Sequence, residues 1–496
     1  MANPPVKARS GFVVGQPEAA AAGLRVLEAG GNAVDAAVTA ALVAGVVALP
    51  SCGIGGYGGA AAIAMNTGKI AAIDFNTEAP ADFPPTPPNH GWLAAGTPGT
   101  LAGLDLALHR YGTLPLRRAL QPSIRFATEG WKLSPSMAAA IGGKAAILRN
   151  DPASAQLLLP GGNPPPPGTL FRNPDLARML TQLARDNSSE AFYRGPIARV
   201  IANAFARGGG SLSEKDLHAY EAREVVPLRI HVGPFTVATP PLASGGATTL
   251  QALQAAYRLP FDDPARRAHA RLECLRLAWQ DRLTLFGDPR FVEVPLERLL
   301  SPAHAEQTAA RVRTAAEKGR PLDLPERTFT SSGTIHISAA DAAGNLCAIT
   351  LTHGDGFGAC VTVPGLGLIL GHGVSRFERT PGHPNAPGPR KSPLHNMCPT
   401  VVLRGRQPLL AIGATGGKKI PNAVFDVLTY TLVDRMSLQD AVKAPRVNTT
   451  GGLALALNNR WSDADAARMS ALGFRVARSQ GATIQAATAD ESASGQ

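Results

Sequence analysis

Helix-like and strand-like segments are grouped along this chain rather than alternating, and this grouping limits the folds that it can adopt. Apolar residues recur at helical spacing through 101–220 and again through 265–320. From residue 332 onward, short strand-like segments are separated by glycine, aspartate and proline turns. These segments cover 334–339, 346–352, 361–370 and 399–404. Grouped strands and grouped helices favour layered α+β architecture over an alternating βαβ sheet.

The beginning of the chain contains two helical patterns followed by a glycine-rich stretch. The first pattern covers 16–30 and ends at two glycines, and a more apolar helix is expected over 33–47. The stretch GIGGYG (53–58) matches GxGxxG, but a dinucleotide site needs a strand before this loop and a helix after it. Here the order is reversed. We therefore reject a dinucleotide site and interpret the stretch as a loop where backbone passes close to backbone.

Length and composition limit the classes of function that the chain can have. A chain of 496 residues predicts two domains or one large multilayer domain. The net charge is +11, but basic residues are interleaved with apolar ones and aromatic residues make up only 5%. Platforms for stacking nucleic-acid bases are therefore scarce, and an anionic small-molecule substrate is favoured over a nucleic-acid partner.

Cysteine usage and apolar runs bear on the compartment. The five cysteines are scattered with no CxxC spacing, which predicts buried thiols in a reducing compartment. The N-terminal segment has no apolar stretch of signal-peptide length, and the longest apolar run, 37–50, is too short for a membrane span. We expect a cytoplasmic protein that does not interact with membranes.

Histidines gather in the second half of the chain, where five of the eleven lie between 336 and 395. A metal site is one interpretation, but no HxH, HExxH or paired-cysteine spacing accompanies them. Scattered core or surface histidines are the favoured interpretation, so no metal and no cofactor are expected. A GxSxG nucleophile elbow and a Walker lysine motif are also absent from the sequence.

Several long blocks resemble the γ-glutamyltransferase family, in the family's order and over nearly the whole chain. The first are GQPEAAAAGLRVLEAGGNAVDAAVTAALVAGVV (15–47) and CGIGGYGG (52–59). The likeness continues through GTPGTLAGLDLALHRYGTLPL (96–116), LSEKDLHAYEAREVVPL (212–228), PPLASGGATTLQAL (240–253) and AWQDRLTLFGDPRFVEVPLERLLS (278–301). It closes with TIHISAADAAGNLCAITLT (334–352), FGACVTVPGLGLIL (357–370), RKSPLHNMCPTVVL (390–403), GATGGKKI (413–420) and MSLQDAVKAPRV (436–447).

This resemblance implies an N-terminal-nucleophile (Ntn) hydrolase, a four-layer αββα sandwich with additional helices. Such a proenzyme cuts itself before a threonine, here between Gly333 and Thr334. Segments 1–333 and 334–496 would then form one fold as a heterodimer, with higher oligomers left open. Thr334 is the implied nucleophile. Cleavage frees its α-amino group, whose ordinary pKa of about 8 suits a general base.

Three further residues match the family's catalytic positions. Thr352 matches the second threonine, whose hydroxyl orients the nucleophile. Gly416 and Gly417 match the backbone N–H pair that stabilises the oxyanion, where glycine permits close approach to the reacting carbonyl.

The substrate positions depart from the family. Asn76 stands where the family has the arginine that holds the glutamyl carboxylate. Three further kinds of family residue are missing: the partners of the α-ammonium, two serines of the site, and the threonine after the nucleophile. The residues that stand in their places are Gly354, Ser375, Arg376, His395, Asn396 and Ile335. Arg376 puts positive charge where the family has negative charge, so an acyl group with an anion and no ammonium would fit.

We therefore expect an autoprocessed threonine amidohydrolase or acyltransferase that acts on a small amide outside the γ-glutamyl class. One alternative is a true γ-glutamyl hydrolase or transpeptidase that acts on glutathione-like substrates. Another is a non-catalytic binding homologue, although the retained Gly333–Thr334, Thr352 and Gly416–Gly417 favour an enzyme.

Overall fold

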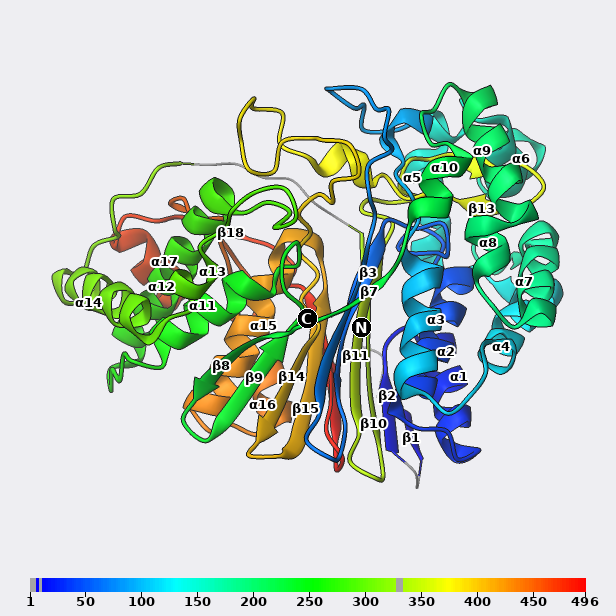
Figure 1. Cartoon of the computed structure of the whole chain (residues 1–496). Helices are drawn as coiled ribbons and strands as arrows, with labels where there is room; N and C mark the ends of the chain where they lie inside the picture. Colours follow the sequence, from blue (N-terminus) through cyan, green and yellow to red (C-terminus); the bar gives the residue numbers. More distant parts are fainter. Residues whose placement is uncertain (1–5, 9–10, 327–332) are drawn as a thin grey trace.

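Two antiparallel sheets lie face to face in the centre of the molecule, and helices cover the outer side of each sheet (Figure 1). The computed structural model describes residues 6–8, 11–326 and 333–496. The resulting order of layers is helices, sheet, sheet, helices. This is the four-layer α+β arrangement that the sequence predicted.

The first sheet has the strand order β1-β2-β10-β11-β3-β4-β7. Its members are β1 (Val6–Ala8), β2 (Gly11–Val14), β10 (Ile335–Asp341), β11 (Leu346–Thr352), β3 (Gly58–Ala64), β4 (Ile70–Asn76) and β7 (Arg223–Val225). The second sheet has the order β20-β19-β15-β14-β9-β8. Its members are β20 (Ser492–Gly495), β19 (Thr483–Ala487), β15 (Gln407–Thr415), β14 (Thr400–Arg404), β9 (Phe235–Thr239) and β8 (Leu228–Val232).

Both sheets mix strands from before and after Gly333. In the first sheet, β10 and β11 lie between β2 and β3, and in the second sheet β9 pairs with β14. In the first half, the sequence indicated only one strand-like segment, 60–65, after the glycine-rich loop, and the other strands were not expected. Any cut at Gly333 would therefore leave two segments that share both sheets.

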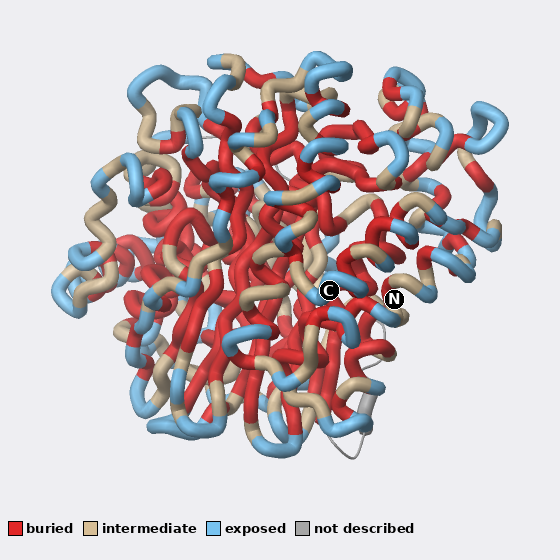
Figure 2. The backbone as a smooth tube through the Cα atoms, turned by 45° about the vertical axis from the view of Figure 1, so that its right-hand side comes forward, coloured by how far each residue is buried: buried red, intermediate tan, exposed pale blue. Residues whose placement is uncertain are grey.

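Small side chains allow the two sheets to approach each other. Alanines dominate the apolar cluster between them, for example Ala62, Ala348 and Ala411. Strands β10 and β11 contact β15 across this layer. Figure 2 shows the central strands as an almost continuously buried core. Close packing of the sheets fixes the ends of β10, β11 and β15 relative to one another.

The helix over the first sheet begins where the sequence predicted. Helix α2 (Ala33–Val47) starts at a capping box formed by Asn32 and Asp35. Every residue of α2 is buried, because it lies between the sheet and the helices α1 (Pro17–Glu28) and α4 (Leu116–Glu129). Its low polarity along all faces, visible in the sequence, is what such a central helix needs.

Other helices complete the outer layers. On the first-sheet side lie α3 (Thr100–Tyr111), α5 (Pro135–Leu148), α6 (Pro152–Leu158), α7 (Pro174–Asp186), α8 (Glu190–Arg194), α9 (Pro196–Gly208) and α10 (Glu214–Ala219) (Figure 1). On the second-sheet side lie α11 (Gly246–Ala256), α12 (Pro264–Leu285), α13 (Leu296–Leu299), α14 (Pro302–Lys318), α15 (Ile420–Leu428), α16 (Leu438–Lys443) and α17 (Asp463–Ala471). Short hairpins and edge pieces are β5 (Trp131–Lys132), β6 (Leu170–Phe171), β12 (Thr362–Val363), β13 (Leu368–Ile369), β16 (Val447–Asn448), β17 (Ala454–Leu457) and β18 (Arg475–Arg478).

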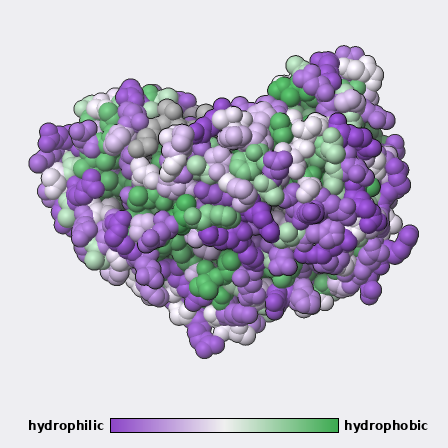
Figure 3. Space-filling model, turned by 45° about the horizontal axis from the view of Figure 1, so that its top comes forward, coloured by the Kyte–Doolittle hydropathy of each residue, from purple (hydrophilic) through white to green (hydrophobic). Residues whose placement is uncertain are grey.

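The surface and the cysteines agree with the expectations from composition. All five cysteines are buried free thiols, as predicted. Within the described residues, no helix combines the length and apolarity that crossing a membrane would require. Hydrophilic side chains cover most of the face seen in Figure 3, with hydrophobic ones in separate patches.

Candidate active site

Thr334 lies at the start of a central strand, directly before β10. Antiparallel pairing of Ile335 with Leu351 puts Thr334 next to Thr352, the last residue of β11. Both threonines are buried, with 4% of each side chain exposed. Their hydroxyl oxygens are 3.4 Å apart. Thr334 is therefore a buried threonine directly before a strand, with a second hydroxyl beside it.

The carbonyl oxygen of Gly333 lies between these hydroxyls. It accepts hydrogen bonds from the hydroxyls of both Thr334 and Thr352. The Thr352 hydroxyl in turn accepts a hydrogen bond from the backbone N–H of Gly354 at 2.7 Å. Gly333 has a φ of +79°, a conformation that disfavours residues with a side chain. The carbonyl before Thr334 is thus polarised by two hydroxyl donors, one of which is the Thr334 hydroxyl itself.

A small pocket of about 20 Å³ surrounds this carbonyl. Its lining brings together most of the residues that the sequence predicted for the site. The lining residues are Tyr57, Gly333, Thr334, Thr352, Gly354, Arg376, Leu394, His395, Asn396, Met397 and Gly417. No aspartate or glutamate is among these described residues.

Three predicted site residues lie outside this lining. Asn76 is buried, and its amide donates at 2.9 Å to the carbonyl of Pro393, the residue before the lining residue Leu394. The Ser375 hydroxyl donates to the His372 carbonyl at 2.7 Å. Gly416 precedes the lining residue Gly417. The sequence comparison placed these residues near the site, but only tertiary packing decides which of them reaches the cavity.

The glycine pair sits at the corner between β15 and α15. Gly417 begins the short helix η4 (Gly417–Lys419), so its N–H belongs to a helix N-terminus, which lacks intrahelical acceptors. Gly416 has a φ of +145°, and a Cβ there would lie 2.9 Å from the Cα of Ala482. Only glycine fits this position without displacing the corner.

Arg376 provides the positive charge of the pocket. It belongs to the short helix η3 (Gly373–Arg376), and its guanidinium donates to the Gly354 carbonyl. Burial lowers the pKa of Arg376 from its ordinary value, while the neighbouring Tyr57 and Asp355 act in the opposite direction. Arg376 therefore faces the site rather than open solvent.

Sequence reasoning missed two residues of this region. Tyr57, from the glycine-rich loop, lines the pocket, and its hydroxyl lies 3.3 Å from the carbonyl oxygens of both Pro393 and Leu394. Arg282 on α12 is buried and donates to the carbonyl of His395 at 2.7 Å. Tyr57 is the only aromatic residue in its glycine-rich stretch, which was a usable signal. Arg282 gave none, because it sits in an ordinary helical pattern.

The sequence of the chain is similar to those of known proteins. A family model described as Gamma-glutamyltranspeptidase matches residues 19–494. The chain belongs to the gamma-glutamyltranspeptidase family. Acylase ACY 1 proenzyme of Pseudomonas sp. (strain V22) is 34% identical over 501 residues, which cover 96% of this chain and 88% of that protein. Glutathione hydrolase proenzyme of Escherichia coli (strain K12) is 31% identical over 475 residues, covering 89% and 81% respectively.

Solved structures agree with this family membership. The crystal structure of cephalosporin acylase from Bacillus halodurans has a TM-score of 0.90 at 27% identity, and covers 98% of this chain and 92% of that one. Helicobacter pylori gamma-glutamyltranspeptidase has a TM-score of 0.57 at 28% identity, covering 63% of this chain and 96% of that one. Our protein thus has the Ntn-hydrolase fold of the gamma-glutamyltranspeptidase family.

The histidines that gather in the second half of the sequence include one in the core of this family member, His336. Within the described residues, no group of three or more His, Cys, Asp or Glu side chains is arranged to hold a metal ion. His336 lies between the sheets, where its ring contacts the hydroxyls of Thr350 at 2.7 Å and Ser338 at 2.9 Å. Burial lowers its pKa to about 3, so it is neutral at physiological pH. The interpretation as scattered core histidines is favoured.

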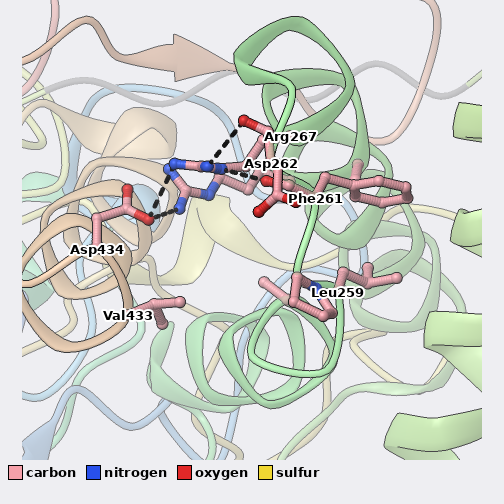
Figure 4. A pocket seen from close by; sticks show the side chains of 10 residues that line it. Leu259, Phe261, Asp262, Arg267, Val433 and Asp434 are labelled. Atoms are coloured by element: carbon pink, nitrogen blue, oxygen red, sulfur yellow. Dashed lines mark hydrogen bonds and ion pairs between the residues drawn. The ribbon is translucent and has the colours of Figure 1, made fainter.

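A larger cavity, of about 290 Å³, lies away from the Thr334 pocket (Figure 4). It sits beside the N-terminal part of α12 and the π-helical turn η5 (Thr429–Val433). Arg267 crosses it, donating to the Phe261 carbonyl at 2.8 Å and pairing with Asp434 at 3.6 Å (Figure 4). None of the predicted site residues lines it. Two of its charged groups, Arg267 and Arg271, are already paired with Asp434.

Proposed function

We propose that this protein is a self-cleaving amidase or acyltransferase whose nucleophile is Thr334 and whose acyl substrate carries an anion but no ammonium. The observation that carries the proposal is the composition of the Thr334 pocket. It holds the guanidinium of Arg376, and no carboxylate is among its described lining residues.

Self-cleavage follows from the position of Gly333. The Thr334 hydroxyl attacks the Gly333 carbonyl carbon, the peptide C–N bond breaks, and the proton of the hydroxyl passes to the nitrogen that becomes the Thr334 amine. Gly333 is then joined to Thr334 by an ester. Water hydrolyses this ester, leaving a carboxylate on Gly333 and restoring the Thr334 hydroxyl. The Thr352 hydroxyl supports the step because it donates to the same carbonyl oxygen.

Substrate turnover would use the same oxygen atom with a new base. The free α-amine of Thr334 accepts the hydroxyl proton as the oxygen attacks the substrate amide carbonyl. The backbone N–H groups of Gly416 and Gly417 stabilise the resulting oxyanion. The amine then leaves with the proton, and water or a second amine removes the acyl group from Thr334.

Charge decides which acyl group fits. A guanidinium presents a fork of donors that matches a carboxylate, and burial strengthens the contact. A substrate ammonium would be repelled by Arg376 and would find no carboxylate in the pocket. The printed names of relatives, an acylase and a cephalosporin acylase, support an acyl group outside the γ-glutamyl class. Glutathione hydrolases among the relatives keep γ-glutamyl substrates as the second candidate.

A matched pair of chromogenic amides tests the proposal. Glutaryl-p-nitroanilide and γ-glutamyl-p-nitroanilide share one carbon chain and its terminal carboxylate, and the second adds only an α-ammonium. We expect a higher kcat/KM for the glutaryl amide. Arg376→Met should raise its KM about 10- to 100-fold, the usual loss for one charged hydrogen-bond partner. The matched control is Arg379→Met, in an exposed arginine of the same loop.

Two outcomes would contradict this assignment. A wild-type protein that prefers the γ-glutamyl amide would support the second candidate instead. An Arg376→Met variant with an unchanged KM would remove Arg376 from the substrate site. The cytoplasmic location expected from the cysteines, and any oligomer beyond the cleaved pair, stay predictions.

A further inference from the structure

An aspartate outside the pocket lining, Asp355, has its backbone next to the scissile glycine. Asp355 follows β11 in the loop that carries Gly354. A Cβ built on Gly333 would lie 3.1 Å from the Cα of Asp355, so the two backbones are in direct contact. The Asp355 carboxylate is also close enough to the pocket to raise the pKa of Arg376, against the effect of burial.

The position of Gly333 indicates where a substrate acyl group binds. In self-cleavage the carbonyl carbon of Gly333 becomes bonded to the Thr334 hydroxyl oxygen. In substrate turnover the acyl carbon of the amide becomes bonded to the same oxygen. The atoms next to Gly333 are therefore neighbours of the first carbons of a bound acyl group. Asp355 is one of these neighbours.

A lysine from a different part of the chain neutralises this carboxylate. Lys144 on α5 pairs with the Asp355 carboxylate at 3.0 Å, and both side chains are about three-quarters buried. The Lys144 ammonium also lies 3.2 Å from Nε2 of His90. Since an ammonium only donates, Nε2 of His90 must accept. Burial and the charge of Lys144 both lower the pKa of His90, which agrees with a neutral ring.

The charges around the acyl position thus favour anions. Lys144 and Arg376 are positive, Asp355 is negative, and His90 contributes no charge. A substrate ammonium would have to compete with Lys144 for Asp355 and would meet a net positive environment. Such built-in competition is a means of rejecting a ligand rather than of attracting one.

We infer that Lys144 is a positioning residue for specificity: by occupying Asp355, it keeps the carboxylate beside the acyl site from receiving an ammonium, so that amino-bearing acyl groups are rejected. This inference rests on the proposed function, because it concerns the same site. It assigns Lys144 and Asp355 a role in choosing between acyl groups that share a carbon chain and differ in charge.

Removal of the lysine charge should therefore create activity rather than destroy it. In Lys144→Met, the ratio of kcat/KM for γ-glutamyl-p-nitroanilide to that for glutaryl-p-nitroanilide should rise about tenfold or more, mainly through KM. Lys144→Gln loses the charge but keeps a donor that can occupy Asp355, so it should raise the ratio less than Lys144→Met. Adding Asp355→Asn to Lys144→Met should abolish the gain, since the carboxylate is then gone.

The controls separate this inference from folding and from the proposed function. Lys132→Met, in an exposed lysine shortly before α5, should leave the ratio unchanged. Self-cleavage of each variant, seen on a denaturing gel, reports that it is folded. A ratio that stays at the wild-type value in both Lys144 variants overturns the inference, as does a gain that survives Asp355→Asn. Wild-type preference for the γ-glutamyl amide overturns only the proposed function, because the Lys144 effect is read relative to the wild type.

Discussion

At the scale of single residues, one carbonyl oxygen receives hydrogen bonds from two hydroxyls. The Gly333 carbonyl accepts from Thr334, the proposed nucleophile, and from Thr352 on the neighbouring strand. The two donors have different consequences. Thr334 supplies the atom that forms the new bond, whereas Thr352 lowers the energy of the charge that develops on the oxygen.

Thr352→Ala should slow self-cleavage about 10²–10³-fold, the usual effect of losing one donor to a developing oxyanion. A time course of precursor loss on denaturing gels measures this rate. Thr352→Ser retains the hydroxyl and should restore most of the rate. If Thr352→Ala cleaves as fast as the wild type, the hydroxyl has no part in the step.

At the scale of elements, the corner between β15 and α15 carries the proposed oxyanion donors. Gly416 combines a φ of +145° with a backbone of Ala482 too close for a side chain. Any larger residue must move the corner and, with it, the N–H of Gly417. The corner thus couples the packing of β15 against its neighbour β19 to the geometry of catalysis.

Gly416→Ala should lower kcat of the mature enzyme about 10²–10³-fold, as expected when an oxyanion donor is displaced. The matched control is Gly405→Ala, in the exposed turn between β14 and β15. Gly405 also has a positive φ, of +58°, but its Cβ would meet nothing within 4 Å. That control should cost only about 1–2 kcal/mol of stability and leave kcat intact. Equal kcat values for both variants would argue against the corner as the oxyanion site.

The elements differ in how far the sequence could predict them. Helix α2 was predicted with its observed bounds, because its cap and its uniformly apolar run are local signals. Strands β8 and β9 were missed because their stability comes from pairing with β14, far along the chain. Periodicity over a few residues cannot report a partner that is distant in sequence.

The residues of the site also differ in how far the sequence could predict them. Thr334, Thr352 and Gly417 were predicted by resemblance and meet in one pocket. Tyr57 was not predicted, although it is the only aromatic residue of its glycine-rich stretch, and Lys144 was not predicted because it lies in an ordinary helical pattern. Their contribution depends on how the outer helices and the glycine-rich loop pack around the central strands.

At the scale of the whole molecule, segments 1–333 and 334–496 share both sheets. Pairs β2–β10, β11–β3 and β9–β14 join one segment to the other. Each segment alone would expose strand edges and the apolar layer between the sheets. The fold is therefore a single body in which the proposed cut would remove a covalent link but no contact layer.

The wild type should give two bands on a denaturing gel, and N-terminal sequencing of the smaller should begin Thr-Ile-His. Under native gel filtration both bands should elute together, since they share both sheets. Thr334→Ala should stay one chain and be inactive. Fragments that separate without denaturant, or an intact wild type that hydrolyses an amide, would refute this picture.

Sharing both sheets also changes what unfolding means once the chain is cut. Before the cut, the strands on either side of Gly333 belong to one chain, so their pairing does not depend on the protein concentration. Afterwards, the same strands belong to separate molecules, so unfolding is also dissociation and the midpoint depends on protein concentration. Recovery from denaturation becomes a second-order reaction that dilution slows. The protein would thus fold as one chain before the cut and keep that fold as two chains after it.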